Sequence, residues 1–348
     1  MDANRLASDT IAAMDETKGT RTVTIRDVAR VAQVSVTTVS HALSSKRPVS
    51  PETAERIRAA IEHLGYVPHS GARSLQRGRA DMIGLVVPDV SDPFFGALAV
   101  SVERSADAVD LGVVLSSSIS PAERDARYFN LLRSRSIDGL IYVAGEARVD
   151  DRLVELAARH PIVLADESIR GLEDIPLVAA DHFQGGRLVA EHLHGLGHRR
   201  VAVLTGPTGL WSADERVSGF RSVFEDAVVV PGDFTEEVAY HRTAKLLGSA
   251  EPPTAIFASN DVSAFGVIDA ARDRGLQVPD DLSVVGFDDI PLSRRLSPPL
   301  TTVRQPVEEI GRTAVSTLTA LIAGDEIDSP PRSPVELIVR GTTHPPRS

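Results

Sequence analysis

The chain has 348 residues, of which 42% are hydrophobic and 24% charged, and its formal net charge is −11. This length fits two or three units of ordinary globular composition. The absence of cysteine excludes disulfides, thiolate metal sites and cysteine nucleophiles, and no apolar run is long enough to cross a bilayer. Residues 1–20 lack the continuous apolar core of a secretory signal, so we expect a mobile tail on a cytoplasmic protein.

Residues 23–43 have the pattern of two short helices separated by a turn of about three residues, which is typical of a helix-turn-helix. Thr24 opens a capping box that predicts the start of the first helix, and Ser35 predicts the start of the second. A third helix is expected from Ser50 to Gly65. Clusters of three helices also occur in proteins that do not bind DNA, so the pattern alone leaves both possibilities open.

The second helix has an apolar inner side and a polar outer side. Its inward positions are either Val36 or Val39, together with Ala42 and Leu43. The outward side chains are those of Thr37, Thr38, Ser40 and His41. Small hydroxyls and a histidine suit phosphate oxygens and base edges in a major groove.

The charge of the chain is unevenly distributed. Residues 21–80 contain 10 Lys and Arg against 4 Asp and Glu, a net charge of +6, which leaves −17 on the other 288 residues. A basic module joined to an acidic body confines the attraction for a polyanion to one end of the molecule. A solvated basic face is the alternative, but the overlap with the helix-turn-helix favours nucleic acid.

Residues 66–80 are basic and contain glycine and proline, which is typical of a linker. The segment HSGARSL could form one or two helical turns, although so short a helix is marginal by itself in water. Folding on DNA would stabilise it and would make Leu75 a wedge between base steps in the minor groove. A flexible linker with an incidental leucine is the alternative.

From Met82 onward, short unalternating apolar runs alternate with helix-length segments. The expected strands are MIGLVVP, GVVLSS, GLIYVA, PIVLAD, RVAVLTG, TAIFAS and SVVGFD. The expected helices cover residues 94–110, 122–135, 150–159, 183–196, 216–225, 235–247 and 261–274. This repetition predicts an α/β fold with two open parallel sheets and a ligand cleft between two lobes, beyond the carboxyl ends of the strands.

No familiar catalytic or cofactor motif is present: there is no GxGxxG after the first strand, no GxxxxGK[ST], no HExxH and no GxSxG. His192, His194 and His198 resemble a metal cluster, but residues two apart on a helix point in different directions. We therefore expect neither an enzyme nor a cofactor nor a metal site.

Over nearly the whole chain the residues resemble the LacI-type transcriptional regulators. The matching segments include TIRDVARVAQVSVTTVSHAL, VSPETAERIRAAIEHLGYVP, ARSL, IGLVVPDVSDPFF, ERVSGF, IFASNDVSAFG, DLSVVGFDDIPLSRRLSPPLTTVRQP and LIVRGTT. The resemblance implies an N-terminal helix-turn-helix domain with a hinge helix, joined to a two-lobed domain like the periplasmic sugar-binding proteins. It also implies a homodimer or tetramer that binds a near-palindromic operator.

The resemblance also implies where the domains begin and end. It implies a tail over 1–20, a DNA-binding domain over 21–66, a hinge over 67–80 and a two-lobed effector and dimerisation domain over 81–348. The first lobe would take about 81–180 and 306–332, and the second about 181–305 and 333–345.

For DNA, the resemblance assigns base contacts to Val36, Thr37 and His41, phosphate contacts to Thr24, Ser35, Thr38 and Ser40, and hinge roles to Ala72, Arg73 and Leu75. Two departures stand out. His41 occupies a position where many members have arginine, so one donor replaces a bidentate fork and the operator preference should differ. Gln33 replaces the usual glycine of the turn, which therefore either accepts a positive φ or adjusts locally.

For the cleft, the resemblance assigns effector contacts to Asp92, Phe94, Phe95, Asp166, Arg216, Phe257, Asn260 and Asp288, with Trp211 as a further candidate. Carboxylates, an amide and an arginine satisfy vicinal hydroxyls, and aromatic faces cover the apolar side of a sugar or base. Each could instead be a strand-end or cap residue, a role expected of Asp261 and Asp289.

The function expected is a repressor whose operator affinity is controlled by a small metabolite, a sugar before a nucleoside. Activation, and the choice between inducer and corepressor, stay open. A sugar-binding transport protein would share the lobes but should carry an export signal in place of residues 21–79. A sugar-processing enzyme would need an acid and base pair.

Overall fold

The computed structural model describes residues 23–44, 47–66, 79–117, 129–145 and 151–347. The expected tail and the hinge residues Ala72, Arg73 and Leu75 lie outside the described residues. The chain divides into two compact units, Met1–Ala80 and Asp81–Ser348, and each is described by itself. Within the described ranges, no helix is both long and apolar enough to span a membrane.

Over its described residues, the N-terminal unit has three helices, α2 (Ile25–Val31), α3 (Val36–Ser44) and α4 (Pro51–Leu64). Their starts follow the predicted caps. The amide and hydroxyl of Thr24 both donate to Asp27 Oδ2, at 3.0 and 2.7 Å, and the Ser35 hydroxyl accepts from the Thr38 amide at 3.0 Å. Gly65 ends α4 with a φ of 58°. The helix-turn-helix prediction is therefore confirmed at the level of local structure.

The core of this unit also decides which valine of α3 faces inward. Val39 is fully buried among Val28, Ala29 and Ile57, whereas Val36 is 41% exposed. A helix turns by about 100° per residue, so Thr37 lies on the side opposite Val39, while Val36, nearly one turn before Val39, lies at the edge of the buried side and stays exposed. The outer face of α3 thus combines one apolar side chain with hydroxyls.

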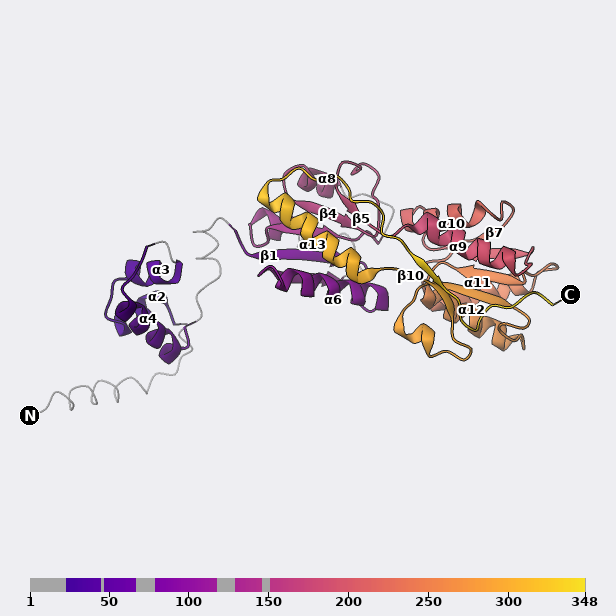
Figure 1. The fold of residues 1–348 in the computed structure, drawn as a ribbon, viewed down its shortest axis with the longest axis horizontal. Helices are drawn as coiled ribbons and strands as arrows, with labels where there is room; N and C mark the ends of the chain where they lie inside the picture. The colour runs from indigo at the N-terminus through magenta and orange to yellow at the C-terminus, as the bar shows by residue number, and fades with distance from the viewer. Residues whose placement is uncertain (1–22, 45–46, 67–78, 118–128, 146–150, 348) are drawn as a thin grey trace, which may run out of the picture. The chain divides into compact units, whose positions relative to one another are not determined.

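The second unit contains two sheets, and each defines a lobe (Figure 1). The sheet of lobe 1 is parallel, with the strand order β2-β1-β3-β4-β5. Its strands are β1 (Met82–Val87), β2 (Gly112–Ser117), β3 (Gly139–Tyr142), β4 (Ile162–Ala165) and β5 (Leu177–Val178). Helices α6 (Pro93–Asp107) and α13 (Val307–Ala323) share a core on one face, and α8 (Asp151–Ala157) packs on the other.

The sheet of lobe 2 has the order β11-β10-β9-β8-β6-β7, with β11 antiparallel to β10 and the other pairs parallel. Its strands are β6 (Val201–Leu204), β7 (Val228–Val230), β8 (Ala255–Ala258), β9 (Ser283–Asp288), β10 (Thr301–Arg304) and β11 (Glu336–Ile338). Helices α9 (His182–Gly195) and α10 (Trp211–Arg221) share one core, α11 (Glu236–Leu247) and α12 (Asp261–Asp273) the other, and a short 3-10 helix, η1 (Pro291–Arg294), follows β9.

The chain passes between the lobes more than once. After β5 it enters lobe 2, after β10 it returns to lobe 1 as α13, and it ends in lobe 2 with β11. Figure 1 shows this return, since the yellow α13 lies among the indigo and magenta elements of lobe 1. The α/β fold with parallel sheets was correctly predicted, but the helix expected from Arg216 begins earlier, at Trp211.

Candidate functional site

The first candidate surface is the outer side of α3 and the start of α2. Thr24, Ser35, Val36 and Thr37 are exposed, and Thr38, Ser40 and His41 are half-buried. The hydroxyls of Ser35 and Thr38 lie 2.8 Å apart and hydrogen-bond each other at the start of the helix. A helix N-terminus with exposed hydroxyls suits phosphate oxygens, and the exposed methyls of Val36 suit the methyl of thymine.

The turn that joins α2 to α3 takes up a strained backbone. Gln33 has a φ of 54°, in the region that favours glycine, so the turn accepts the positive φ rather than adjusting around it. The Arg56 guanidinium of α4 donates to the carbonyls of Ala32 (2.7 Å) and Gln33 (3.3 Å). This clamp offsets the strain by fixing both carbonyls at the end of α2.

The second candidate site is a cavity of about 180 Å³ between the two lobes. It is lined from lobe 1 by loops after β1, β3 and β4, and from lobe 2 by segments after β6, β7, β8 and β9. The lining residues are Pro88, Asp89, Asp92, Phe94, Phe95, Ala144, Gly145, Asp166, Glu167, Pro207, Leu210, Ser212, Arg216, Asp233, Phe234, Thr235, Asn260 and Asp288. Each of these segments lies at the carboxyl end of its strand, which is where doubly wound sheets bind ligands.

Arg216 of α10 is the cation among the described lining residues, and only 3% of its surface is exposed. Its Nε donates to His182 Nδ1 at 3.3 Å, and its Nη1 donates to the carbonyl of Ser259. The guanidinium carbon lies 3.9 Å from the centre of the Phe287 ring and 5.7 Å from that of Phe234. Stacking and hydrogen bonding together fix the guanidinium in one orientation.

Asp166 and His182 form a buried pair beside Arg216. His182 Nε2 lies 3.2 Å from Asp166 Oδ1 and 3.3 Å from the Asp166 carbonyl oxygen. Burial and the Arg216 charge lower the pKa of His182, so the imidazole is neutral, with Nδ1 accepting from Arg216 and Nε2 carrying the proton. Burial acts to raise the pKa of Asp166, but His182 and Arg216 outweigh it and keep this carboxylate ionised.

Glu167 reaches from lobe 1 to lobe 2. Its carboxylate accepts the Ser212 amide at 3.0 Å and also the Ser212 hydroxyl, in the first turn of α10. The N-cap of that helix, Leu210, has no capping side chain, so Glu167 supplies the cap from the other lobe. Burial and the neighbouring Asp166 raise the pKa of Glu167 to about 8.

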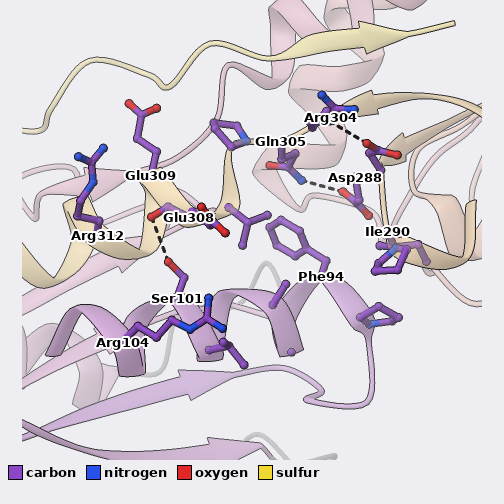
Figure 2. A pocket seen from close by; sticks show the side chains of 18 of the residues that line it. Phe94, Ser101, Arg104, Asp288, Ile290, Arg304, Gln305, Glu308, Glu309 and Arg312 are labelled. Atoms are coloured by element: carbon purple, nitrogen blue, oxygen red, sulfur yellow. Dashed lines mark hydrogen bonds and ion pairs between the residues drawn. The ribbon is translucent and has the colours of Figure 1, made fainter. Parts of the chain in front are cut away.

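Asp288 ends β9 with a φ of 115° and is buried at the cavity wall. Gln305 Nε2 donates to its Oδ1 at 2.7 Å, a contact that Figure 2 shows beside Phe94 and Arg304. Burial raises the pKa of Asp288 well above its usual range, Arg216 opposes this, and Asp261 and Asp92 add to it. The pKa of Asp92, which caps α6 by accepting the Phe94 amide at 2.8 Å, is also raised by burial.

Most of the predicted cleft residues line this one cavity: Asp92, Phe94, Phe95, Asp166, Arg216, Asn260 and Asp288. Phe257 does not, and its assignment is corrected. Its fully buried ring stacks on Phe220, with centroids 5.5 Å apart, in the lobe 2 core. Trp211 also lies outside the lining, with the Arg332 guanidinium 4.6 Å from its ring centre and His182 at its edge.

Sequence reasoning missed several lining residues, chiefly Glu167, Ser212, Phe234 and Thr235. Glu167 directly follows a predicted strand-end carboxylate, which was a usable signal. Asp261 and Asp289, expected to be structural, make contacts within lobe 2. Asp261 accepts from the Ile290 amide and from two hydroxyls, and Asp289 pairs with three arginines, Arg294, Arg304 and Arg340.

Two family profiles match the chain: "Bacterial regulatory proteins, lacI family" over residues 24–69 and "Periplasmic binding protein-like domain" over residues 190–343. The ribose operon repressor of Halalkalibacterium halodurans is 39% identical over 325 residues, covering 92% of this chain and 97% of its own. The transcriptional regulator DegA of Bacillus subtilis is 36% identical over 337 residues, covering 92% and 98%.

Among solved structures, the Lac repressor dimer bound to operator and the anti-inducer ONPF superposes with a TM-score of 0.82 at 30% identity. That match covers 93% of this chain and 100% of the repressor chain. Both the profiles and these relatives span the two units, the helix-turn-helix and the paired lobes. The chain therefore belongs to the LacI family of bacterial regulatory proteins.

Proposed function

We propose that this chain is a repressor that binds a near-palindromic operator as a homodimer and that a monosaccharide-sized ligand between the lobes sets its operator affinity. The observation that carries the proposal is the inter-lobe cavity, walled by Arg216, Asn260 and several carboxylates, in a chain that also has a helix-turn-helix. Family membership makes it a DNA-binding transcriptional regulator. We also propose that it acts in the cytoplasm, where a bacterial regulator meets DNA.

On the DNA, α3 enters the major groove. Val36, Thr37 and His41 contact base edges, while Thr24, Ser35, Thr38 and Ser40 contact phosphates. The exposure of Val36 and Thr37 and the burial of Val39 support this orientation of the helix. Ala72, Arg73 and Leu75 form the hinge that enters the minor groove in this proposal.

The effector is a sugar, with a nucleoside as the second choice. The cavity holds roughly the volume of six water molecules at about 30 Å³ each, which suits a single sugar ring better than a disaccharide. The H. halodurans relative is named for a ribose operon, and the Lac repressor structure contains the anti-inducer ONPF, which supports a sugar-like effector for this chain. Carboxylates, the Asn260 amide and Arg216 provide both donors and acceptors for hydroxyl groups.

Binding between the lobes changes operator affinity because lining residues come from both lobes. A ligand that contacts both favours one relative orientation of the lobes over another. A coupling of about 1 to 3 kcal/mol shifts operator affinity roughly 5- to 150-fold. The relatives are transcriptional regulators, and we propose that this chain likewise carries out no turnover of its ligand.

The test is recovery of genomic DNA by the purified full-length chain, with and without a panel of sugars and nucleosides. The proposal expects a short near-palindrome whose recovery changes with one ligand. Failure to enrich any site under every condition would contradict DNA binding and favour a sugar-binding protein that does not act on DNA. Enrichment that no ligand alters would support the DNA-binding regulator and contradict its control by an effector from this panel.

A further inference from the structure

The wall of the inter-lobe cavity is strongly acidic. Among the residues that the structure describes, its lining includes six carboxylates and a single cation, Arg216. The carboxylates belong to Asp89, Asp92, Asp166, Glu167, Asp233 and Asp288. An acidic wall of this kind selects among ligands by charge, because buried like charges are costly unless a partner neutralises them.

Three of these carboxylates, Asp92, Asp166 and Asp288, line the same cavity from the two lobes. Asp92 lies within electrostatic reach of Asp166 in its own lobe and of Asp288 across the cavity. Asp166 is 4% exposed, and its Oδ1 receives no aligned hydrogen bond within the described structure although His182 is near. A buried acceptor of this kind facing a cavity indicates a donor supplied by a ligand.

The cation in the wall is already engaged. Arg216 donates to His182 and to the Ser259 carbonyl, and its plane stacks on Phe287. A phosphate or carboxylate on the ligand would meet one committed guanidinium, and the carboxylate that stays ionised beside it, Asp166, would repel the anion. The wall therefore disfavours anionic ligands such as sugar phosphates and nucleotides.

We propose that the effector is an aminated monosaccharide whose ammonium group lies among Asp92, Asp166 and Asp288. The inference rests on the proposed function and narrows its ligand class from a sugar to an amino sugar. An ammonium has three donors, one for each of these three carboxylates in the cavity wall. Since Asp92 and Asp166 belong to lobe 1 and Asp288 to lobe 2, the same group joins the lobes.

A bound ammonium would alter the titration of two of these carboxyl groups. Burial and neighbouring carboxylates raise the pKa of Asp92 and of Asp288, with Arg216 opposing both shifts, and Asp89 and Asp166 add to the shift of Asp92. A cation bound beside these groups lowers the pKa of each. At a pH where these groups are partly protonated, amine binding therefore releases protons, whereas binding of an uncharged sugar does not.

The experiment is isothermal titration calorimetry on the full-length chain with glucosamine, galactosamine and mannosamine. Each is compared with its N-acetyl form, its parent hexose and its 6-phosphate, in two buffers of different ionisation enthalpy. We expect one amine to bind about tenfold to a hundredfold more tightly than its N-acetyl form and parent hexose. We also expect its apparent enthalpy to differ between the buffers because protons are released.

Two substitutions locate the amine. Asp92→Asn keeps a good helix cap for α6, so it should fold, and it should reduce the preference for the amine about tenfold. Asp269→Asn removes an exposed acid of α12 that pairs with Arg272, and it should leave the preference unchanged. A preference that survives Asp92→Asn at full strength would overturn the placement.

The remaining outcomes separate this inference from the proposed function. If a parent hexose, an N-acetyl form or a phosphate bound more tightly than the matching amine, the amino-sugar inference would be wrong, but a sugar effector would still be supported. Binding of none of these sugars by a chain that still binds its operator would overturn the amine, and the response of operator recovery to the wider panel of sugars and nucleosides would then test the sugar effector separately.

Discussion

Glu167 should hold the two lobes together through the first turn of α10. Its carboxylate follows β4 in lobe 1, is 3% exposed and accepts two hydrogen bonds from Ser212 in lobe 2. Glu167→Ala leaves the amide and hydroxyl of Ser212 without acceptors. Each buried unsatisfied donor costs about 1 to 3 kcal/mol. Because the adjacent cavity admits water, the lower value applies to each donor, and we expect a loss of about 2 kcal/mol in the free energy of unfolding.

Urea unfolding followed by tryptophan fluorescence measures this loss, since the sole tryptophan, Trp211, is the first residue of α10. Glu167→Gln keeps an acceptor for the amide and gains a donor for the hydroxyl, so it should cost less than about 1 kcal/mol. Glu191→Ala on α9, whose carboxylate is half exposed beside Arg187, is the control and should have almost no effect. Equal stability of Glu167→Ala and Glu191→Ala would refute the reasoning.

Three further predictions concern pH, helix packing and the turn of the DNA-binding unit. The pKa of Glu167 is about 8 in the folded chain against 4.5 as its ordinary value, so its contribution to stability is present below pH 4.5 and is lost as pH rises toward 8. Urea unfolding from pH 5 to 8 should show a shallower decline for Glu167→Gln than for the wild type, and parallel declines would contradict this. A Cβ at Gly219 would lie 1.9 Å from the Phe183 carbonyl oxygen, so Gly219→Ala should separate α9 from α10 and cost about 1 to 3 kcal/mol in thermal unfolding. Gly195→Ala, which meets no atom within 4 Å, is its control and should cost nothing. Gln33→Gly should stabilise the N-terminal unit by about 1 kcal/mol by relieving the positive φ, and a lower melting temperature in circular dichroism would show that the side chain matters more than the strain.

The features that the sequence predicted well are local ones. The caps at Thr24, Ser35 and Ser50 act within three residues of themselves, so the helix starts could be located from neighbouring letters alone. The buried strands were equally visible, because strands covered on both faces consist of short apolar runs. Strand order and lobe membership depend on contacts between distant segments.

The errors in the site have the same origin. Glu167 was missed because its partner, Ser212, is 45 residues away and belongs to a helix expected to begin only at Arg216. Phe257 was assigned to the cleft by resemblance to the family, but side chains alternate along a strand and this one faces the lobe 2 core. Val36 and Val39 could not be separated because both fit one helical face until α4 packs on it.

The central claim is that a ligand in the inter-lobe cavity controls binding to DNA. The most direct measurement is operator affinity by fluorescence anisotropy, with and without the effector, for the wild type, Arg216→Ala and Arg187→Ala. Arg216 is buried in the cavity wall, whereas Arg187 is exposed on α9 and pairs with Glu191. The account predicts that both variants bind the operator and that only Arg216→Ala loses the roughly 5- to 150-fold response to effector. A full response from Arg216→Ala would contradict it.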